Sequence, residues 1–180
     1  DAQSYSVSTV DVTVSQVCRQ KVNGWDLILD DHVIDRMGTL RKEKLPNETG
    51  GVLIGAFDMQ RKYIYVVDVI DSPSDSEEAP NCYIRGTVDL QADVQRYASL
   101  TDGQLVYIGE WHSHPRGCPA IASTTDEALV GTLHKLRSGD GHPALMAIVG
   151  EGGKTSWYVD DTNDHAYFTS TANEVNTISA

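Results

Sequence analysis

Residues 109–126 read GEWHSHPRGCPAIASTTD, and they continue an expected buried strand, Leu105–Glu110. Side chains two residues apart on a strand point to the same side, so we expect His112 and His114 to converge if strand geometry persists. Asp126 falls in the first turn of the helix expected next, from where its carboxylate could return to the same point. Two neutral imidazoles and one carboxylate are a common ligand set of catalytic zinc, with the fourth tetrahedral position left for water.

The same residues also have simpler interpretations. An isolated histidine is in most cases a solvated surface residue, and Ser123 with Asp126 fits a capping box at a helix start. The roles of helix cap and site residue are compatible for Ser123, because one helix start can serve both. The ligand types alone would also permit a non-haem iron enzyme with two histidines and one carboxylate.

Hydrophobic periodicity on both sides of this stretch predicts alternating strands and helices. An amphipathic helix is expected to begin at an aspartate cap and to end before Pro46. Its cap is Asp30 or Asp31, and its apolar positions are Val33, Ile34, Met37 and Leu40. The other expected elements are strands at Trp25–Leu29, Gly51–Phe57, Tyr63–Ile70, Cys82–Ile84, Ala144–Val149 and Ser156–Val159, and a helix from about Thr124 to Leu136.

The spacing of these elements predicts the fold class. A tight polar turn separates Gly51–Phe57 from Tyr63–Ile70, so these two strands are expected to form an antiparallel hairpin. Other strands alternate with helices. We therefore predict an α/β fold with a mixed, partly antiparallel β-sheet flanked by helices.

Two segments between the main elements are predicted from turn chemistry. The acidic, turn-rich stretch Ser72–Pro80 is expected to be a solvated loop. Thr87 is expected to cap a second helix that ends at Asp102–Gly103. The imperfect apolar stripe of that helix consists of Val88, Val94, Tyr97 and Leu100.

One compact domain with tails is expected from a length of 180 residues. We place this domain at residues 25–160. Residues 1–24 are expected to be a linker or an added edge strand, because valines at 10, 12 and 14 alternate with polar residues. Residues 161–180 are expected to be a polar C-terminal strand or a mobile tail. The chain begins with Asp1 rather than Met, which favours a piece of a longer protein or a processed start.

The composition argues against several classes of function. The chain has 14 Lys and Arg against 26 Asp and Glu, a formal net charge of −12 and a pI near 4.7. Such a chain repels phosphate, so partners such as nucleic acid or an anionic membrane are not expected, and a basic partner is favoured. The longest apolar run, Ala144–Val149, is far shorter than the ~20 residues of a membrane-spanning helix. The three cysteines, Cys18, Cys82 and Cys118, lack metal-type spacing and predict a reducing, cytoplasmic location.

A further element upstream extends the metal-ligand pattern. Glu48 lies in NETGGVLIG, at an expected junction of helix and strand. Glu-x-Gly-Gly-x-Leu-Ile-Gly, then His-Ser-His-Pro after a strand and Ser-x-x-Asp at a helix start, together resemble the JAMM/MPN metalloprotease family, also called JAB. The resemblance covers about residues 25–160. It implies the MPN/JAB fold, a three-layer arrangement similar to that of cytidine deaminases.

The resemblance implies a zinc-dependent isopeptidase or peptidase that removes a ubiquitin-like protein from target proteins or from its precursor. In that family pattern His112, His114 and Asp126 look like the zinc ligands. Glu48 looks like the general base that acts on the zinc-bound water, and Ser123 like the donor to the oxyanion.

The phrase Tyr-Ile-Gly-Glu-Trp-His-Ser-His-Pro is most similar to the bacterial branch of this family. Members of that branch occur beside, or fused to, ubiquitin-activating-type adenylating enzymes in defence and conjugation-like operons. The implied partners are therefore a ubiquitin-like modifier with its conjugates, and an adenylating domain in the same chain or operon.

Two observations qualify the resemblance. Many domains of this fold are catalytically silent scaffolds or binding modules, although the intact Glu48, His112, His114 and Asp126 argue against that alternative. In addition, the loop Pro115–Ala122 is one residue longer than the family pattern. We expect the extra residue to bulge beside the site and to leave the ligand geometry intact.

Other residues near the pattern are not assigned a function. A redox switch and an inhibitory fourth zinc ligand are the functional alternatives for Cys118, but we expect a single cysteine in a loop to be inert. His134 and His142 are expected to be ordinary surface residues. Trp111 is expected either to pack in the core or to line a substrate groove.

Overall fold

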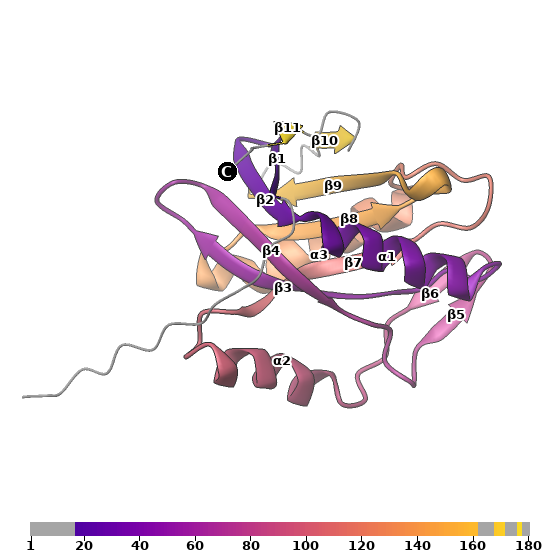
Figure 1. The fold of residues 1–180 in the computed structure, drawn as a ribbon, viewed down its shortest axis with the longest axis horizontal. Coiled ribbons are helices and arrows are strands. Elements are labelled where there is room, and N and C mark those ends of the chain that lie inside the picture. The colour runs from indigo at the N-terminus through magenta and orange to yellow at the C-terminus, as the bar shows by residue number, and fades with distance from the viewer. Residues whose placement is uncertain (1–16, 162–167, 172–175, 178–180) are drawn as a thin grey trace, which may run out of the picture.

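A computed structural model describes residues 17–161, 168–171 and 176–177 (Figure 1). Its three helices are α1 (Asp31–Lys44), α2 (Leu90–Leu100) and α3 (Thr124–Arg137). The strands are β1 (Val17–Val22), β2 (Trp25–Asp30), β3 (Gly50–Asp58), β4 (Tyr63–Ile70), β5 (Glu77–Ala79), β6 (Cys82–Ile84), β7 (Val106–Ser113), β8 (Ala144–Val149), β9 (Thr155–Asp160), β10 (Phe168–Thr171) and β11 (Asn176–Thr177). Two short 3-10 turns, η1 (Ser138–Asp140) and η2 (Glu151–Gly153), follow α3 and β8.

Nine strands form one sheet in the order β10-β9-β8-β7-β3-β4-β2-β1-β11 (Figure 1). The pairs β2–β4 and β7–β8 are parallel, and the other neighbouring pairs are antiparallel. The predicted hairpin exists as β3 and β4. The predicted fold class, a mixed and partly antiparallel sheet flanked by helices, is therefore confirmed.

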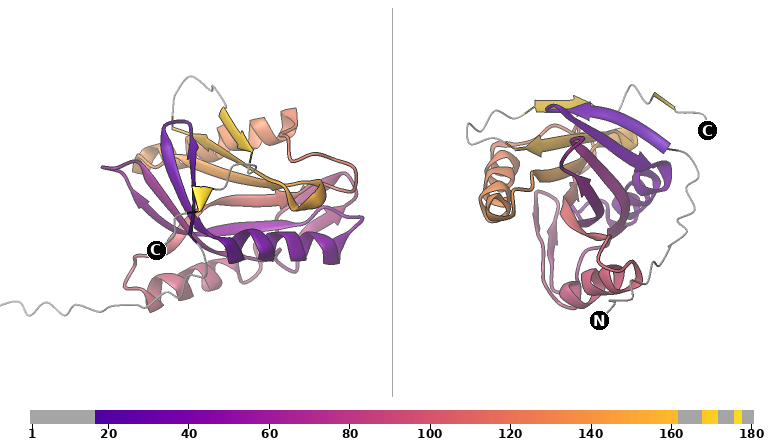
Figure 2. Two further views of the ribbon diagram at one scale, coloured as in Figure 1. Left: turned by 45° about the horizontal axis from the view of Figure 1, so that its top comes forward. Right: turned by 90° about the vertical axis from the view of Figure 1, so that its left-hand side faces the viewer.

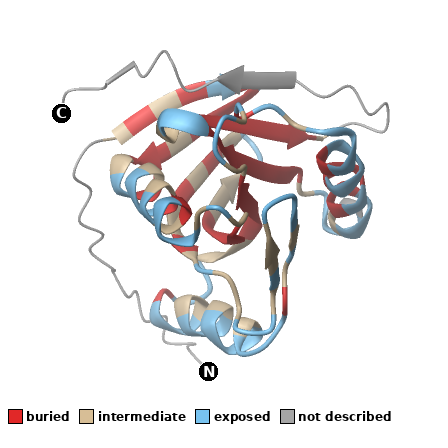
Figure 3. Cartoon of the chain, turned by 90° about the vertical axis from the view of Figure 1, so that its right-hand side faces the viewer, coloured by how far each residue is buried: buried red, intermediate tan, exposed pale blue. Residues whose placement is uncertain are grey.

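The sheet lies between α1 and α3, which makes three layers (Figures 2 and 3). On the α1 side, Val33 and Met37 of the helix join a core of strand residues that includes Trp25, Leu53 and Trp111. On the α3 side, Val130 and Leu133 belong to a second cluster. Both clusters are apolar, and each Leu, Ile or Met fully removed from water contributes roughly 1.5–3 kcal/mol.

Strand β8, in the middle of the sheet, is buried along its whole length. Its residues Leu145, Ala147 and Val149 belong to the α1-side core, while Ala144, Met146 and Ile148 belong to the α3-side cluster. A continuous apolar run is typical of a strand covered on both faces. The neighbouring strand β7, which leads into the HSHP motif, is therefore held by a fully buried partner.

The first helix begins and ends where the sequence predicts. Asp30 is its cap, with an extended backbone and a side-chain Oδ1 atom that accepts the N–H of His32 at 3.0 Å. The last helical residue is Lys44, and Leu45 leaves the helical conformation directly before Pro46. This follows from the steric restriction that proline places on the residue before it.

Two predictions for the remaining segments are wrong. Part of the expected loop Ser72–Pro80 is strand β5, which pairs with β6 in a separate two-stranded hairpin. The second helix starts at Leu90 rather than after a cap at Thr87, because Asp89 has a left-handed backbone (φ 61°) that a right-handed helix cannot include. The N–H groups of Thr87 and Val88 before it donate to the Asp75 carboxylate. The expected apolar stripe is not a core face, since no residue of α2 is buried (Figure 3).

The sheet starts before Trp25, where we expected the domain to begin. Strand β1 pairs along its length with β2, and its Cys18 and Val22 are buried in the core. The alternating valines at 10–14 lie outside the described residues. Within the described part, none of the helices is both long and apolar enough to span a membrane.

Candidate metal centre

His112 lies in the middle of the sheet, near the end of β7. It pairs with Gly50 of β3 on one side and with Ile148 of β8 on the other, and it is buried. His114 lies two residues beyond His112, just past the end of β7. Its N–H donates to the carbonyl oxygen of Val149 at 2.9 Å, so the extended course continues long enough to bring both imidazoles together. The two ring centroids are 5.3 Å apart.

Asp126 returns to the same point from the first turn of α3. The Nε2 atom of His112 lies 3.1 Å from Oδ1 of Asp126, and the Nε2 atom of His114 lies 3.5 Å from its Oδ2. The three possible ligand atoms all lie within 4.8 Å of one another. The structure therefore brings together the three residues that the sequence predicts as metal ligands.

The hydrogen bonds of His114 determine which of its nitrogens faces this point. Its Nδ1 lies 2.8 Å from the carbonyl oxygen of Pro119, which can only accept, so Nδ1 is the donor. In the neutral ring Nε2 then carries the lone pair that a metal requires, whereas in the protonated ring Nε2 donates to Asp126. Histidine ligands of zinc are usually oriented by such a bond from the other ring nitrogen. The donor set and its orientation therefore fit a zinc ion.

Electrostatics at the three residues follow from the same geometry. Burial raises the pKa of Asp126, but hydrogen bonds from His112 and His114 outweigh it and hold this pKa well below its usual range. The pKa of His114 is raised, chiefly by its bond to Asp126. In the metal-free protein the carboxylate is therefore ionised and ready to bind a cation.

Glu48 lies beside this cluster, two residues before the strand position that pairs with His112. Its N–H donates to the carbonyl oxygen of Ala79 in β5, at 2.9 Å. Its neighbour Thr49 exchanges hydrogen bonds with Ser113, between the two histidines. Burial raises the pKa of Glu48, while the charges of His112 and His114 lower it and that of Asp126 raises it. Its carboxylate is therefore within electrostatic reach of all three predicted ligands.

Ser123 forms the predicted capping box. Its Oγ donates to Oδ2 of Asp126 at 2.7 Å, its N–H donates to the same oxygen at 2.7 Å, and its carbonyl oxygen accepts the N–H of Glu127. The cap orients the Asp126 carboxylate toward the histidines. In this structure the hydroxyl of Ser123 is therefore engaged by Asp126.

The structure also tests the residues that we left unassigned. Trp111 is in the core, where its Nε1 donates to the carbonyl oxygen of Ile70. The prediction that His134 is a surface residue is wrong: it is buried and its Nδ1 lies 3.1 Å from the carbonyl oxygen of Asp160. His142 stacks on Phe57 with ring centroids 4.9 Å apart and is half-buried. Cys118 is a half-buried free cysteine.

Sequence reasoning missed the charged residue that contacts the backbone of the site. Arg41, in the last turn of α1, is buried and donates to the carbonyl oxygens of His114 and Pro115. A signal was present, because position 41 follows Val33 and Met37 at intervals of four residues and so lies on the buried face of α1.

A family model described as prokaryotic homologs of the JAB domain matches residues 30–160. A protein named CD-NTase/cGAS isopeptidase from Enterobacter hormaechei subsp. hoffmannii is 30% identical over 95 residues, which are 53% of this chain and 51% of that protein. A protein of the same name from Vibrio cholerae serotype O1 is 30% identical over 100 residues, 54% of this chain and 62% of that protein.

The aligned part therefore spans only about half to three fifths of the length of these relatives. Among solved structures, the solution structure of a protein from Desulfitobacterium hafniense matches with a TM-score of 0.48 and 20% identity, over 79% of this chain and 87% of that chain.

Proposed function

Because the chain belongs to the family of prokaryotic homologs of the JAB domain, we propose that it is a zinc-dependent isopeptidase of the JAMM type. The observation that carries this proposal is the convergence of His112, His114 and Asp126 on one point, with the ligand atoms within 4.8 Å of one another. Glu48 beside them adds a proton acceptor that an iron site with the same ligands would not need.

His112 and His114 would hold zinc through their Nε2 atoms, and Asp126 through a carboxylate oxygen. When bound, zinc supplies a Lewis acid that polarises a carbonyl group and acidifies water at neutral pH. The three side chains are already oriented for this by the β7 ladder, the Pro119 carbonyl group and the Ser123 cap. Little reorganisation is needed to bind the ion.

Glu48 is proposed as the general base. It would take a proton from the attacking water and deliver it to the departing lysine amine, which requires a pKa closer to neutrality than that of a free carboxyl group. The burial that raises the pKa of Glu48 supports this role. Ser123 is proposed as the oxyanion donor, for which its hydroxyl would turn from Asp126 to the substrate carbonyl oxygen.

The proposed substrate is a conjugate in which the C-terminus of a ubiquitin-like protein is joined to a lysine side chain. The names of the similar proteins support an isopeptide bond and a CD-NTase or cGAS-like enzyme as the conjugated target. The second proposed reaction of the same site is removal of the modifier from its precursor, by cleavage of a linear peptide bond. The proposed partner is an adenylating enzyme that forms the conjugate. It would be encoded in the same operon or be part of the same chain.

The proposal is tested by metal analysis together with cleavage. Protein purified without added metal is expected to hold about one zinc per chain and to cleave an isopeptide-linked conjugate of a ubiquitin-like protein. Glu48→Gln is expected to keep the zinc and to lose at least ~10²-fold in cleavage rate, in line with the usual contribution of a general base.

Each alternative gives a different result. Iron in place of zinc would support the non-haem iron enzyme with two histidines and one carboxylate. Zinc-free protein that binds conjugates without cleaving them would support a scaffold. A Glu48→Gln variant with full activity would overturn the proposed mechanism while leaving the metal site intact.

A further inference from the structure

Arg41 is a buried arginine whose guanidinium group donates hydrogen bonds to the backbone of the site. Only 4% of its surface is exposed. Its Nε donates to the carbonyl oxygen of His114 at 2.8 Å, and its Nη2 donates to the carbonyl oxygen of Pro115 at 3.0 Å. Burying a guanidinium group is costly unless its donors are satisfied, so a buried arginine with this pattern has a specific task.

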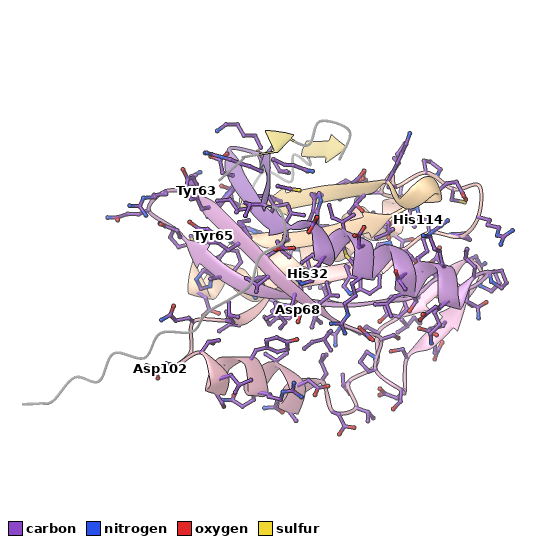
Figure 4. All side chains as sticks on the ribbon, in the orientation of Figure 1. His32, Tyr63, Tyr65, Asp68, Asp102 and His114 are labelled. Atoms are coloured by element: carbon purple, nitrogen blue, oxygen red, sulfur yellow. The ribbon has the colours of Figure 1, made fainter. Side chains whose placement is uncertain are left out.

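His114 needs such a contact because it lies outside the strand. His112 is fixed by ladder pairs with Gly50 and Ile148 on both sides. β7 ends at Ser113, so the backbone of His114 is held by its N–H bond to Val149 and by Arg41 at its carbonyl oxygen. Figure 4 shows His114 near the end of α1 that carries Arg41, while His32 marks the other end of this helix.

Glu151 connects Arg41 to the loop that orients the His114 ring. Its Oε2 lies 3.4 Å from Nη2 of Arg41 and also accepts the N–H of Gly117 at 2.8 Å. The N–H of Glu151 donates to the carbonyl oxygen of Cys118 at 3.0 Å. The next residue, Pro119, supplies the carbonyl oxygen that bonds Nδ1 of His114. Arg41 therefore holds the backbone of His114 directly and, through Glu151, the loop that fixes its ring.

We propose that Arg41 and Glu151 are positioning residues that present Nε2 of His114 to the metal. This inference rests on the proposed zinc site. The planar guanidinium fork can serve the carbonyl groups of two successive residues and a carboxylate at once. A lysine keeps the charge but not this fork, so Arg41→Lys tests geometry rather than electrostatics.

The first measurement is zinc affinity by competition with a chelator. Arg41→Lys is expected to weaken zinc binding by about 10–100-fold, the usual effect of losing a group that orients a ligand. The Glu151 side chain is more than half exposed, so Glu151→Ala is expected to fold normally. This variant is also expected to bind zinc more weakly than the wild-type chain. The double variant should lose less zinc affinity than the product of the two single effects, because both residues act through one network.

Two controls separate positioning from stability. Arg36→Lys changes the same residue type on the same helix, where Arg36 bridges Asp68 and Asp71, and should leave zinc affinity unchanged. Val33→Ala removes a buried methyl pair from the α1 face and should lower stability without a comparable loss of zinc affinity. Unchanged zinc affinity in both Arg41→Lys and Glu151→Ala would overturn the inference.

The second measurement is made without metal. Backbone hydrogen exchange at residues 115–122 is expected to accelerate in Arg41→Lys and Glu151→Ala but not in Arg36→Lys, because the N–H of Gly117 loses its anchored acceptor. Unchanged exchange would overturn the inference even if the protein binds zinc. If the wild-type chain failed to bind zinc, the proposed function would fail, whereas this experiment would still decide whether Arg41 holds the loop.

Discussion

The Nδ1 atom of His114 lies 2.8 Å from the carbonyl oxygen of Pro119, and this bond directs Nε2 toward Asp126. His134 makes the same kind of bond, with its Nδ1 3.1 Å from the carbonyl oxygen of Asp160. Of these two histidines, only His114 belongs to a group of possible metal ligands in the described part of the chain.

This comparison gives the first prediction. His114→Ala is expected to lose zinc and cleavage together, because one of three protein ligands is removed. His134→Ala is expected to keep about one zinc per chain while losing about 1–3 kcal/mol of unfolding free energy, since a buried side chain and its hydrogen bond are removed. Zinc content after dialysis and urea unfolding measure the two effects. Zinc retained at wild-type affinity in His114→Ala would contradict the assignment.

Ser123 gives a second prediction because it has two separable roles. Ser123→Ala removes the cap of α3, which costs about 1 kcal/mol of stability, and removes the proposed oxyanion donor, which costs about 10²–10³ in kcat. Ser123→Gly has no side-chain donor, but glycine at a helix cap costs only a few tenths of a kcal/mol. It is expected to recover most of the stability of α3 without recovering kcat. Recovery of kcat in Ser123→Gly would limit Ser123 to capping.

Much of the site was accessible from the sequence because its positions depend on local rules. Period-2 geometry places His112 and His114 together, and a capping box places Ser123 and Asp126 at one helix start. A helix stop before Pro46 places Glu48 in the short connection to β3. None of these needs knowledge of the complete fold. The convergence of His112, His114 and Asp126 was expected from strand and helix geometry, and it is what the distances show.

The rest of the structure depends on contacts between segments far apart in the chain. The hairpin of β5 and β6 has few apolar residues, and it is held by bonds such as that of Glu78 to Thr49 and Lys44. The segment before α2 is held by the Asp75 carboxylate, which accepts the N–H groups of Thr87 and Val88. The burial of Arg41 and His134 likewise depends on carbonyl groups supplied by other elements. Helix periodicity places Arg41 on the buried face of α1, but neither composition nor periodicity identifies the partners of such bonds.

A third prediction concerns the contact between α2 and the sheet. The hydroxyl of Tyr97 donates to Oδ2 of Asp68 at 2.6 Å, and Asp68 is labelled in Figure 4. Burial, together with this bond, raises the pKa of Tyr97 to about 12. The folded value exceeds the unfolded value of about 10, so the stabilisation is fully present below pH ~10 and is lost as pH rises through about 12.

Tyr97→Phe should therefore be less stable than the wild-type chain by about 1 kcal/mol at pH 8, because a hydrogen bond to a partly exposed carboxylate is lost. The difference is expected to shrink between pH 10 and 12. Urea unfolding of both proteins at pH 8, 10 and 11 measures it. A difference that stays constant over this range would show that the hydroxyl does not stabilise α2 through its bond to Asp68.

The last prediction concerns Gly50, the residue of β3 that pairs with His112. A Cβ atom at this position would collide with the carbonyl oxygen of Trp111 and with the ring of Tyr83. The carbonyl group belongs to β7 itself and cannot yield without moving His112. Gly50→Ala is therefore expected to lose about 1–3 kcal/mol of stability and to bind zinc more weakly.

Gly38→Ala is the matched control, because a Cβ at this position of α1 meets no atom within 4 Å. This variant should gain up to about 1 kcal/mol of stability. Wild-type zinc affinity in Gly50→Ala would mean that β7 can shift without displacing the ligand, and that the close packing of β3 on β7 serves stability alone.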